Sequence, residues 1–344
     1  MTRILSRRAA LAMATLALSS LPLSAQTPAT VTARVGIIPV LGAAPIFVVD
    51  KAGLAHDAGL DLKFSTFESG PVMIQALASG TLDIYVGGVT PLGVARSKGI
   101  DVRVLTATAT EEMTAAAGPK LATYFKPGVN PAQAFHDFHA ATGKPARLAT
   151  QPPGSVPHTT LVYWLREATK TDKSDYEIVP MGIEATQQAL LAGAVDGATI
   201  REPTDTIVTG RDPRIKIVAL GGAMFPSQPG TVVAVSGAFA TKYPDRVQKL
   251  VDGLVKADQM IKSDPQKVAP YIAAALGSGL IDDATIVKAL ASPATKFTID
   301  PRVIEDATAK MQSFQVTIGT LDKDVPLTGL FDTSYYLKAI GGSP

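Results

Sequence analysis

The sequence of 344 residues contains no cysteine. This absence excludes disulfides, thiolate nucleophiles, iron–sulfur clusters, cysteine-based zinc sites and lipid attachment through a cysteine. Aromatic residues make up only 6% of the chain, which argues against a surface that stacks nucleic-acid bases. Hydrophobic residues reach 46%, and glycine and proline follow no fixed period. Collagen-like and disordered classes are therefore excluded, and the length favours about two domains.

Long hydrophobic runs are scarce, and the longest one lies near the start. Three arginines precede the largely apolar residues 9–23, which end in Ser24-Ala25. A membrane span needs about 20 residues, so residues 1–25 are typical of a cleaved export signal. Arg7-Arg8 also resembles a twin-arginine signal. We expect a soluble protein exported to the periplasm, cleaved after Ala25 or after Ala29.

The excess of basic residues belongs to this segment. The whole chain has 32 Lys and Arg against 30 Asp and Glu. Without the three arginines of residues 1–25, 29 basic residues face 30 acidic ones, a net charge of −1. A nucleic-acid partner then has no electrostatic basis and is not expected.

The remaining chain alternates strand and helix patterns, which favours an α/β fold with parallel strands joined by crossover helices. Strands are predicted at 33–40, 60–67, 82–86, 102–108, 146–150, 176–180, 195–200, 215–220 and 231–236. Helices are predicted at 44–51, 72–78, 91–98, 157–168 and 184–192, with a short one from Pro203. Residues 111–142 appear as a looser stretch rich in Ala, Pro and Gly, and everything after Asp245 is expected to be helical.

Small residues precede several of the predicted helices, at the carboxyl ends of strands. Helix N-termini gather there in such a sheet and present backbone N–H groups to an anion. The candidate contacts are Ser69, Gly70, Val89, Thr90, Gly154 and Ser155, with His158 in the first turn of its helix. Ordinary helix capping by Ser and Thr is the alternative interpretation of each turn.

A second candidate contact is the turn Arg201-Glu202, which follows an apolar strand. An arginine at that position can bind a carboxylate or sulfonate with two hydrogen bonds. The alternative is a local ion pair of Arg201 with Glu202 or with Asp205.

Enzymatic and metal-binding motifs are weak. His136 and His139 share a helical face, but no third ligand is signalled nearby, so a solvated helix face is the preferred interpretation. Ser155 and His158 lack the strand–Ser–helix motif of hydrolases, and no phosphate or dinucleotide loop occurs. We predict no catalytic residue, no metal ligand and no cofactor.

The order of these turns resembles a known family. Arg34–Ile37, Lys51–Leu54, Phe67–Pro71 and Leu82–Pro91 are followed by the segments Gly143–Ser155 and Phe239–Val247. Together they resemble the sulfonate/nitrate/taurine/thiamine-precursor family of ABC-transporter substrate-binding proteins. The resemblance covers residues 32–276.

This resemblance implies a two-lobed periplasmic binding protein type II fold, with two mixed sheets flanked by helices, two hinge strands and a helical C-terminal tail. Lobe one would comprise 32–108 plus 232–344 and lobe two 113–227, with hinges near 105–112 and 228–236. It also implies that Gly42 and Ala43 join the residues above as ligand contacts. The family often has an aromatic residue at the position of Arg201, so the arginine favours a ligand with a strong anionic group.

The implied function is capture of a small anion for an ABC permease, by a monomer. Two other functions remain open from the sequence. One is an enzyme on the same fold, of the pyrimidine-synthase or menaquinone-pathway type. The other is a periplasmic sensor module that reports ligand occupancy to a receptor.

Overall fold

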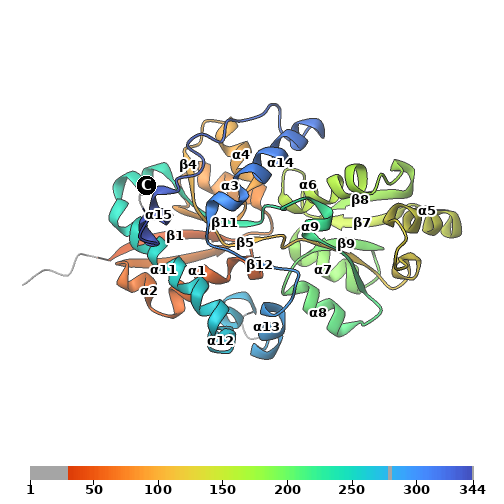
Figure 1. Cartoon of the computed structure of the whole chain (residues 1–344), viewed down its shortest axis with the longest axis horizontal. Helices are drawn as coiled ribbons and strands as arrows, with labels where there is room; N and C mark the ends of the chain where they lie inside the picture. Colours follow the sequence, from red (N-terminus) through yellow and green to blue (C-terminus); the bar gives the residue numbers. More distant parts are fainter. Residues whose placement is uncertain (1–29, 278–280, 343–344) are drawn as a thin grey trace, which may run out of the picture.

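The computed structural model describes residues 30–277 and 281–342; the predicted export signal, residues 1–25, lies outside them. The described chain forms two halves side by side along the longest axis (Figure 1). Each half is one five-stranded mixed sheet with helices on both faces. The predicted α/β class with two mixed sheets is confirmed.

The first half is built on the strand order β2-β1-β3-β11-β4. Strand β1 pairs in parallel with β2 and β3, while β11 is antiparallel to β3 and β4. The parallel pairs reflect crossover helices between them, and β11 enters from a distant part of the chain. The strands are β1 Val31–Ile37, β2 Leu60–Thr66, β3 Ile84–Gly88, β4 Val102–Ala107 and β11 Thr231–Ser236.

The second half has the order β10-β6-β9-β7-β8. Strand β7 is parallel to β8 and β9, and β6 is antiparallel to β9 and β10. Its strands are β6 Thr114–Ala117, β7 Ala146–Thr150, β8 Tyr176–Pro180, β9 Gly197–Ile200 and β10 Lys216–Leu220. The prediction left β6 inside the looser stretch 111–142, because its three alanines carry no β-branched pattern.

The same stretch also contains the helix α5, Pro131–Thr142. Asn130 caps it by accepting a hydrogen bond of 3.0 Å from Ala132 N, and Gly143 ends it with φ 69°. Both are ordinary helix signals that an Ala-rich composition concealed.

Two adjacent segments connect the halves, at 108–113 and 225–230. Glu111 N donates to Gln228 O over 2.8 Å, and Thr108 N donates to Thr231 O over 2.9 Å. Strand β5, Ala109–Thr110, pairs with β12, Lys296–Phe297. The short strand β12 corrects the expectation of an all-helical region after Asp245. Both connections lie within or next to the predicted hinge regions.

Helices cover both faces of each sheet and enclose the apolar core. In the first half they are α1 Ala44–Lys51, α2 Leu54–Asp57, α3 Gly70–Ala78, α4 Thr90–Ser97, α10 Gly237–Lys242, α11 Pro244–Ser263, α12 Pro265–Gly277, α13 Asp283–Leu290, α14 Glu305–Thr317 and α15 Ser334–Ala339. In the second half they are α5, α6 Val156–Tyr163, α7 Ile183–Leu191, α8 Thr204–Arg211 and α9 Gly221–Met224.

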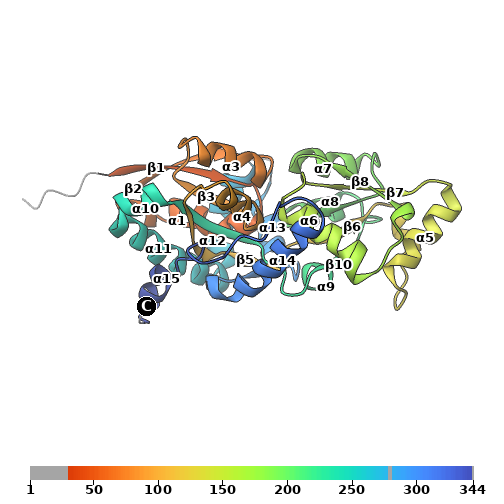
Figure 2. The ribbon, with the colours of Figure 1, turned by 90° about the horizontal axis from the view of Figure 1, so that it is seen from above.

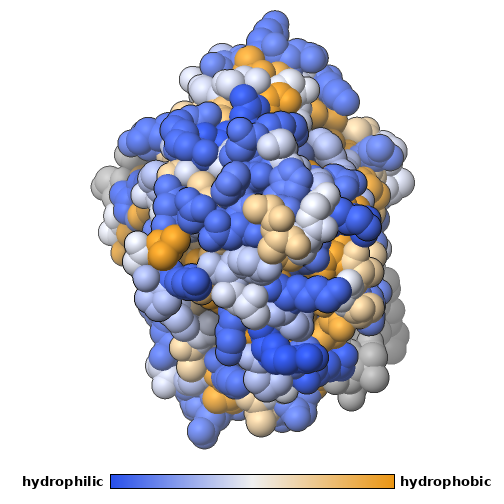
Figure 3. All heavy atoms as spheres, turned by 90° about the vertical axis from the view of Figure 1, so that its right-hand side faces the viewer, coloured by the Kyte–Doolittle hydropathy of each residue, from blue (hydrophilic) through white to orange (hydrophobic). Residues whose placement is uncertain are grey.

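Helix α14 packs against α4 of the first half and α6 of the second, and Figure 2 shows it between the halves. Its Met311 joins Met113, Val156 and Phe225 in a small buried apolar cluster. The outer end of the second half presents mainly hydrophilic residues, with hydrophobic atoms in small separate patches (Figure 3). Across residues 30–277 and 281–342, no helix combines the length and the apolar character that crossing a membrane requires.

Candidate functional site

Five turns from the two halves meet along one surface, which we call the seam. Thr90 Oγ1 of the first half donates a hydrogen bond of 2.9 Å to Gly154 O of the second. Leu41 N donates one of 2.8 Å to the carbonyl oxygen of Glu202. These bonds join the halves directly. The turns are residues 41–43, 69–70, 89–90, 154–155 and 201–202.

The seam turns follow from local sequence. Helices α1, α3 and α4 each have proline at their second position, where its missing N–H costs no helical hydrogen bond. Each helix starts one residue earlier than the proline. Close approach across the seam also requires glycine: a Cβ on Gly88 would lie 2.7 Å from Val156 Cγ2.

A buried ion pair lies beside the seam. Arg201 Nη1 contacts Glu112 Oε1 at 3.0 Å, and the two side chains are only 3% and 1% exposed. Thr231 Oγ1 donates a second hydrogen bond of 2.7 Å to the same oxygen. The pair thus links β9, the connection between halves, and β11. The partner of Arg201 is Glu112, and neither Glu202 nor Asp205, which the sequence suggested.

Three polar atoms at the seam are buried and have no hydrogen-bond partner among the described residues: Arg201 Nε, Glu112 Oε2 and Ser69 Oγ. Such an atom costs about 1–3 kcal/mol when nothing satisfies it. Within the described chain, the seam therefore holds one unsatisfied donor on Arg201, one unsatisfied carboxylate oxygen on Glu112 and one unsatisfied hydroxyl on Ser69.

The cavity at Arg201 is small. Its volume is about 10 Å³, which suits roughly one water molecule and no organic anion. It is lined by Met113, Gln151, Pro157, Ile183, Thr186, Thr199, Ile200, Arg201 and Thr204. In this arrangement of the halves, the cavity has no room for an organic anion beside Arg201.

Most of these lining residues, and Glu112, were not predicted from the sequence. Thr199 could have been predicted from the sequence. It precedes Arg201 by two positions, and because side chains alternate along a strand, both residues lie on the same face. Thr199 Oγ1 donates to Thr150 Oγ1 over 2.6 Å, which holds β9 to β7. Glu112 gave no signal, since it is 89 residues away from its partner.

The side chain of Glu202 is hydrogen-bonded to the first turn of α8 and to Ser292. It accepts hydrogen bonds of 3.1 Å from both N and Oγ1 of Thr206. Burial raises the pKa of Glu202, and hydrogen bonds from Ser292 and Thr206 oppose that rise. Burial and the adjacent charge of Glu202 also raise the pKa of Asp205 well above its usual value. Asp205 accepts a bond of 2.7 Å from Thr114 Oγ1, so it holds β6 to α8.

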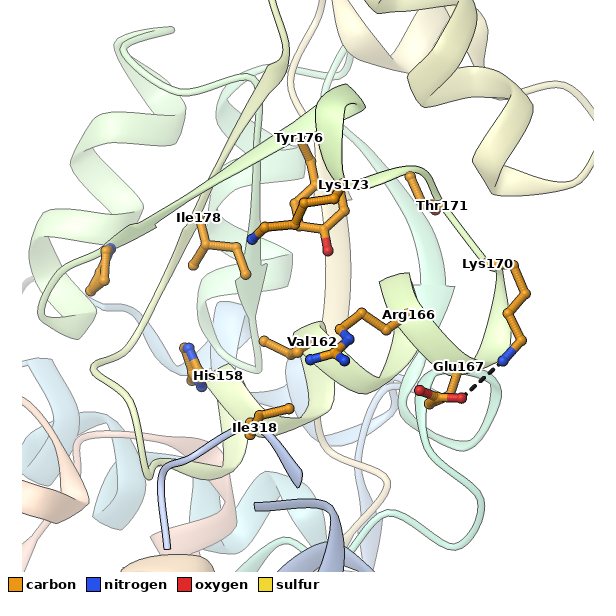
Figure 4. Close-up of a pocket in the computed structure, with 11 residues that line it drawn as sticks. His158, Val162, Arg166, Glu167, Lys170, Thr171, Lys173, Tyr176, Ile178 and Ile318 are labelled. Carbon is orange, nitrogen blue, oxygen red and sulfur yellow. Dashed lines mark hydrogen bonds and ion pairs between the residues drawn. The ribbon is translucent and has the colours of Figure 1, made fainter. Parts of the chain in front are cut away.

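Ser155 and His158 lie at the start of α6. Ser155 Oγ accepts a hydrogen bond of 3.3 Å from His158 N, which is the capping role. Burial lowers the pKa of His158 to about 4, so the imidazole is neutral at neutral pH. Its ring lines a groove on the second half (Figure 4), whereas Arg201 lines a different cavity. The structure thus brings Gly42, Ala43, Ser69, Gly70, Val89, Thr90, Gly154, Ser155, Arg201 and Glu202 to the seam, and His158 beside it.

The two histidines of α5 face one carboxylate. His139 Nδ1 lies 2.8 Å from Asp175 Oδ1, and His136 Nδ1 lies 3.5 Å from Asp175 Oδ2. Asp175 is buried and belongs to the turn before β8. Within the described residues, no group of three or more His, Cys, Asp or Glu is placed to hold a metal ion.

Solved structures with the same fold include binding proteins and an enzyme. The alkanesulfonate-binding protein of Xanthomonas axonopodis pv. citri, bound to MOPS, has a TM-score of 0.69 at 19% identity, covering 88% of this chain and 98% of that one. The periplasmic nitrate-binding protein of Synechocystis has a TM-score of 0.72 at 14% sequence identity, and the match covers 91% of this chain and 89% of that one. A desulfurization enzyme has a TM-score of 0.60 at 15% sequence identity, and the match covers 90% of this chain and 99% of that one. The periplasmic binding protein fold is therefore confirmed.

Curated relatives match along two thirds of the chain. The nitrate import ATP-binding protein of Synechococcus elongatus is 26% identical over 240 residues, 69% of this chain. The chain spans only 36% of that protein's length. A protein of Brachyspira hyodysenteriae, provisionally named an ABC transporter periplasmic binding protein, is 25% identical over 242 residues, 69% of this chain and 67% of its own.

The family model of the NMT1-like family matches residues 26–277, which is most of the chain and contains every seam turn. The matched span agrees with the residues 32–276 on which the predicted resemblance rests. The predicted resemblance to this family of substrate-binding proteins is therefore confirmed. The chain belongs to the NMT1-like family.

Proposed function

We propose that this chain is the periplasmic solute-binding protein of an ABC importer, and that it captures a small organic or inorganic anion at the seam. The observation that carries the proposal is the buried guanidinium of Arg201, where turns from both halves converge. One edge of that group contacts Glu112, and its Nε has no acceptor among the described residues. A ligand oxygen at Nε would make a charge-assisted hydrogen bond.

Backbone donors complete the proposed site. Helices α3, α4 and α6 start at the seam, next to Ser69, Val89 and Ser155. Helix N-termini favour negative charge through their N–H groups and their dipole. The sulfonate- and nitrate-binding names of proteins with this fold support the same ligand class.

The proposed cycle is opening and closing about the two connections. We propose 32–108 plus 232–344 and 113–227 as the moving lobes. Separation breaks the Thr90–Gly154 and Leu41–Glu202 hydrogen bonds and exposes Arg201. A ligand favours the closed form only because it contacts both lobes at once.

Binding without chemical turnover is the preferred form of this proposal. Threonine hydroxyls, the amide of Gln151, several apolar side chains and the paired carboxylate of Glu112 surround Arg201, and His158 lines a different concavity. An enzyme with the same fold is known, but no feature of this seam favours that function. The proposed partners are the solute and an inner-membrane permease, and the proposed state is a monomer in the periplasm without a lipid anchor.

A thermal-shift screen tests the proposal. The chain is heated with alkanesulfonates, nitrate, bicarbonate, aromatic carboxylates and thiamine precursors, each at several concentrations. A solute at about 100 times its Kd stabilises the folded state by about 2.7 kcal/mol. We expect one anion class to raise the melting temperature in a concentration-dependent way. Stabilisation by none of these solutes would contradict the proposal.

An activity control separates binding from turnover. The stabilising solute is incubated with the chain and recovered, and its mass and amount are measured. We expect unchanged solute. Conversion to a product at a rate that scales with protein concentration would favour the enzyme instead.

A further inference from the structure

A wide groove lies on the second half, apart from the cavity at Arg201. Its volume is about 890 Å³, within the usual range of small-molecule sites. Helix α6, the helical turn that follows it, strand β8 and Ile318 after α14 form its walls (Figure 4). None of its lining residues lines the small cavity at Arg201. The groove is therefore a distinct concavity.

The charges in the groove are predominantly positive. Arg166, Lys170 and Lys173 line it with a single acid, Glu167. Lys170 Nζ and Glu167 Oε2 form an ion pair of 2.8 Å, so their charges cancel. Arg166 and Lys173 form no ion pair within 4 Å among the described residues, although the charge of Arg166 contributes, after Lys170, to lowering the pKa of Glu167. Two positive charges thus remain without a paired acid.

The neighbouring acids are engaged elsewhere. Asp172, next to Lys173, accepts bonds of 2.8 and 2.7 Å from N and Oγ of Ser174. Glu177 lies 3.8 Å from Arg147, and Asp175 faces the two histidines of α5. An anion that enters the groove therefore meets Arg166 and Lys173 without a competing carboxylate in contact with them.

Apart from Thr171 and His158, the remaining lining is apolar or aromatic. Val162, Ile178, Pro180 and Ile318 supply aliphatic surface, and Tyr176 supplies a ring. Lys173 Nζ lies 5.2 Å from the centre of that ring. In Figure 4 the side chain of Arg166 lies close to Val162, below Tyr176 and Ile178. The groove thus places two cationic groups among aliphatic and aromatic surface.

The backbone holds this arrangement in place. Residues Trp164–Ala168 form a π-helical turn, in which Thr169 N donates to Trp164 O over 2.9 Å. Turns of this kind are rare and occur frequently at functional sites. Thr171 N donates to Leu165 O over 2.7 Å, which fixes the loop that carries Lys173 opposite Arg166.

We propose that this groove is a second binding site, for an organic anion that carries a carboxylate or sulfonate on an aromatic or branched apolar body. Arg166 and Lys173 bind the anionic group, and Val162, Ile178 and Ile318 cover the body. The proposal is independent of the solute at the seam. A purely inorganic anion has no apolar body and leaves these walls exposed, so it binds more weakly.

Calorimetric titration of the purified chain with 2-naphthalenesulfonate tests the proposal, with methanesulfonate as the probe that lacks the apolar body. The test variant is Arg166→Gln with Lys173→Gln. The matched control is Arg214→Gln with Lys216→Gln, which removes the same charge from exposed positions of the same half, outside the groove. Arg201→Lys serves as the seam control.

We expect naphthalenesulfonate to bind the wild type at least tenfold more tightly than methanesulfonate. The test variant weakens that binding at least tenfold, while the matched control and the seam control change it less than twofold. Methyl NMR signals of Val162 and Ile178 shift on binding. Undetectable binding to the wild type, equal binding to the test variant, or loss of binding in Arg201→Lys alone would overturn the proposal.

Discussion

The buried pair of Glu112 and Arg201 gives the sharpest stability prediction. Both side chains are almost fully buried, and Glu112 Oε1 accepts from both Arg201 and Thr231. Glu112→Gln keeps the shape and an oxygen acceptor but leaves the arginine charge without its counter-charge. Breaking a buried pair in this way costs about 3–5 kcal/mol. That is a large part of a total stability of about 5–15 kcal/mol.

The double variant distinguishes charge from shape. Arg201→Gln alone leaves the carboxylate of Glu112 unpaired and costs a similar amount. With both residues replaced by glutamine, no unpaired charge is buried, and two amides can bond to each other. We expect the double variant to lose at least about 2 kcal/mol less than the sum of the single losses.

Urea denaturation measures these differences. The sole tryptophan, Trp164, is buried in the second half and reports unfolding by fluorescence. Asp83→Asn is the control, because it weakens the partly exposed pair with Arg34 and costs about 1 kcal/mol or less. Losses below about 1 kcal/mol for Glu112→Gln, or additive losses in the double variant, would refute the reasoning.

Three further predictions concern other parts of the seam and its surroundings. Burial lowers the pKa of His158 to about 4, so the unfolded chain binds this proton more tightly. The free energy of unfolding should fall by up to about 3 kcal/mol from pH 7 to pH 4. The fall should be smaller in His158→Gln. An NMR titration in which the His158 ring of the folded protein has a pKa of about 6.5, the value of a free histidine, would contradict this. Gly42→Ala places a Cβ against Glu112 Oε2 and 2.7 Å from Thr231 Oγ1, and should cost about 1–3 kcal/mol. Gly210→Ala, in the open part of α8, should instead stabilise by about 0.5–1 kcal/mol in the same denaturation assay; equal effects would contradict the packing argument. Thr90→Val removes the bond to Gly154 and should shift the chain toward the open form, which solution scattering detects as a larger radius of gyration; an unchanged radius would contradict this.

Local signals in the sequence were enough to predict most of the fold. Strands β7 and β8 have the predicted bounds, because β-branched and apolar residues lie between clear turn residues. Strand β6 was missed, since Thr114–Ala117 has no strand pattern of its own. It forms because β9 and β10 pair with it on either side, which is a tertiary effect that a local pattern does not contain.

The candidate site was predictable only where it rests on helix starts. Small residues before Pro71 and Pro91 indicated backbone donors, and the structure places those turns at the seam. The partner of Arg201 was not predictable, because Glu112 reaches it across 89 residues. His158 was predicted as a ligand contact, and its side chain lines the groove that also contains Arg166. The direction of a side chain in the first helical turn depends on packing that the sequence alone does not give.

The central claim is that a small anion binds Arg201 at the seam. Calorimetric titration of the solute selected by the thermal-shift screen tests it most directly, in the wild type, in Arg201→Ala and in Arg201→Lys. The lysine variant keeps a positive charge beside Glu112 but lacks Nε. We predict that both variants bind the solute at least about tenfold more weakly, a difference of about 1.4 kcal/mol. Unchanged affinity in Arg201→Ala, with the variant folded by circular dichroism, would contradict the account.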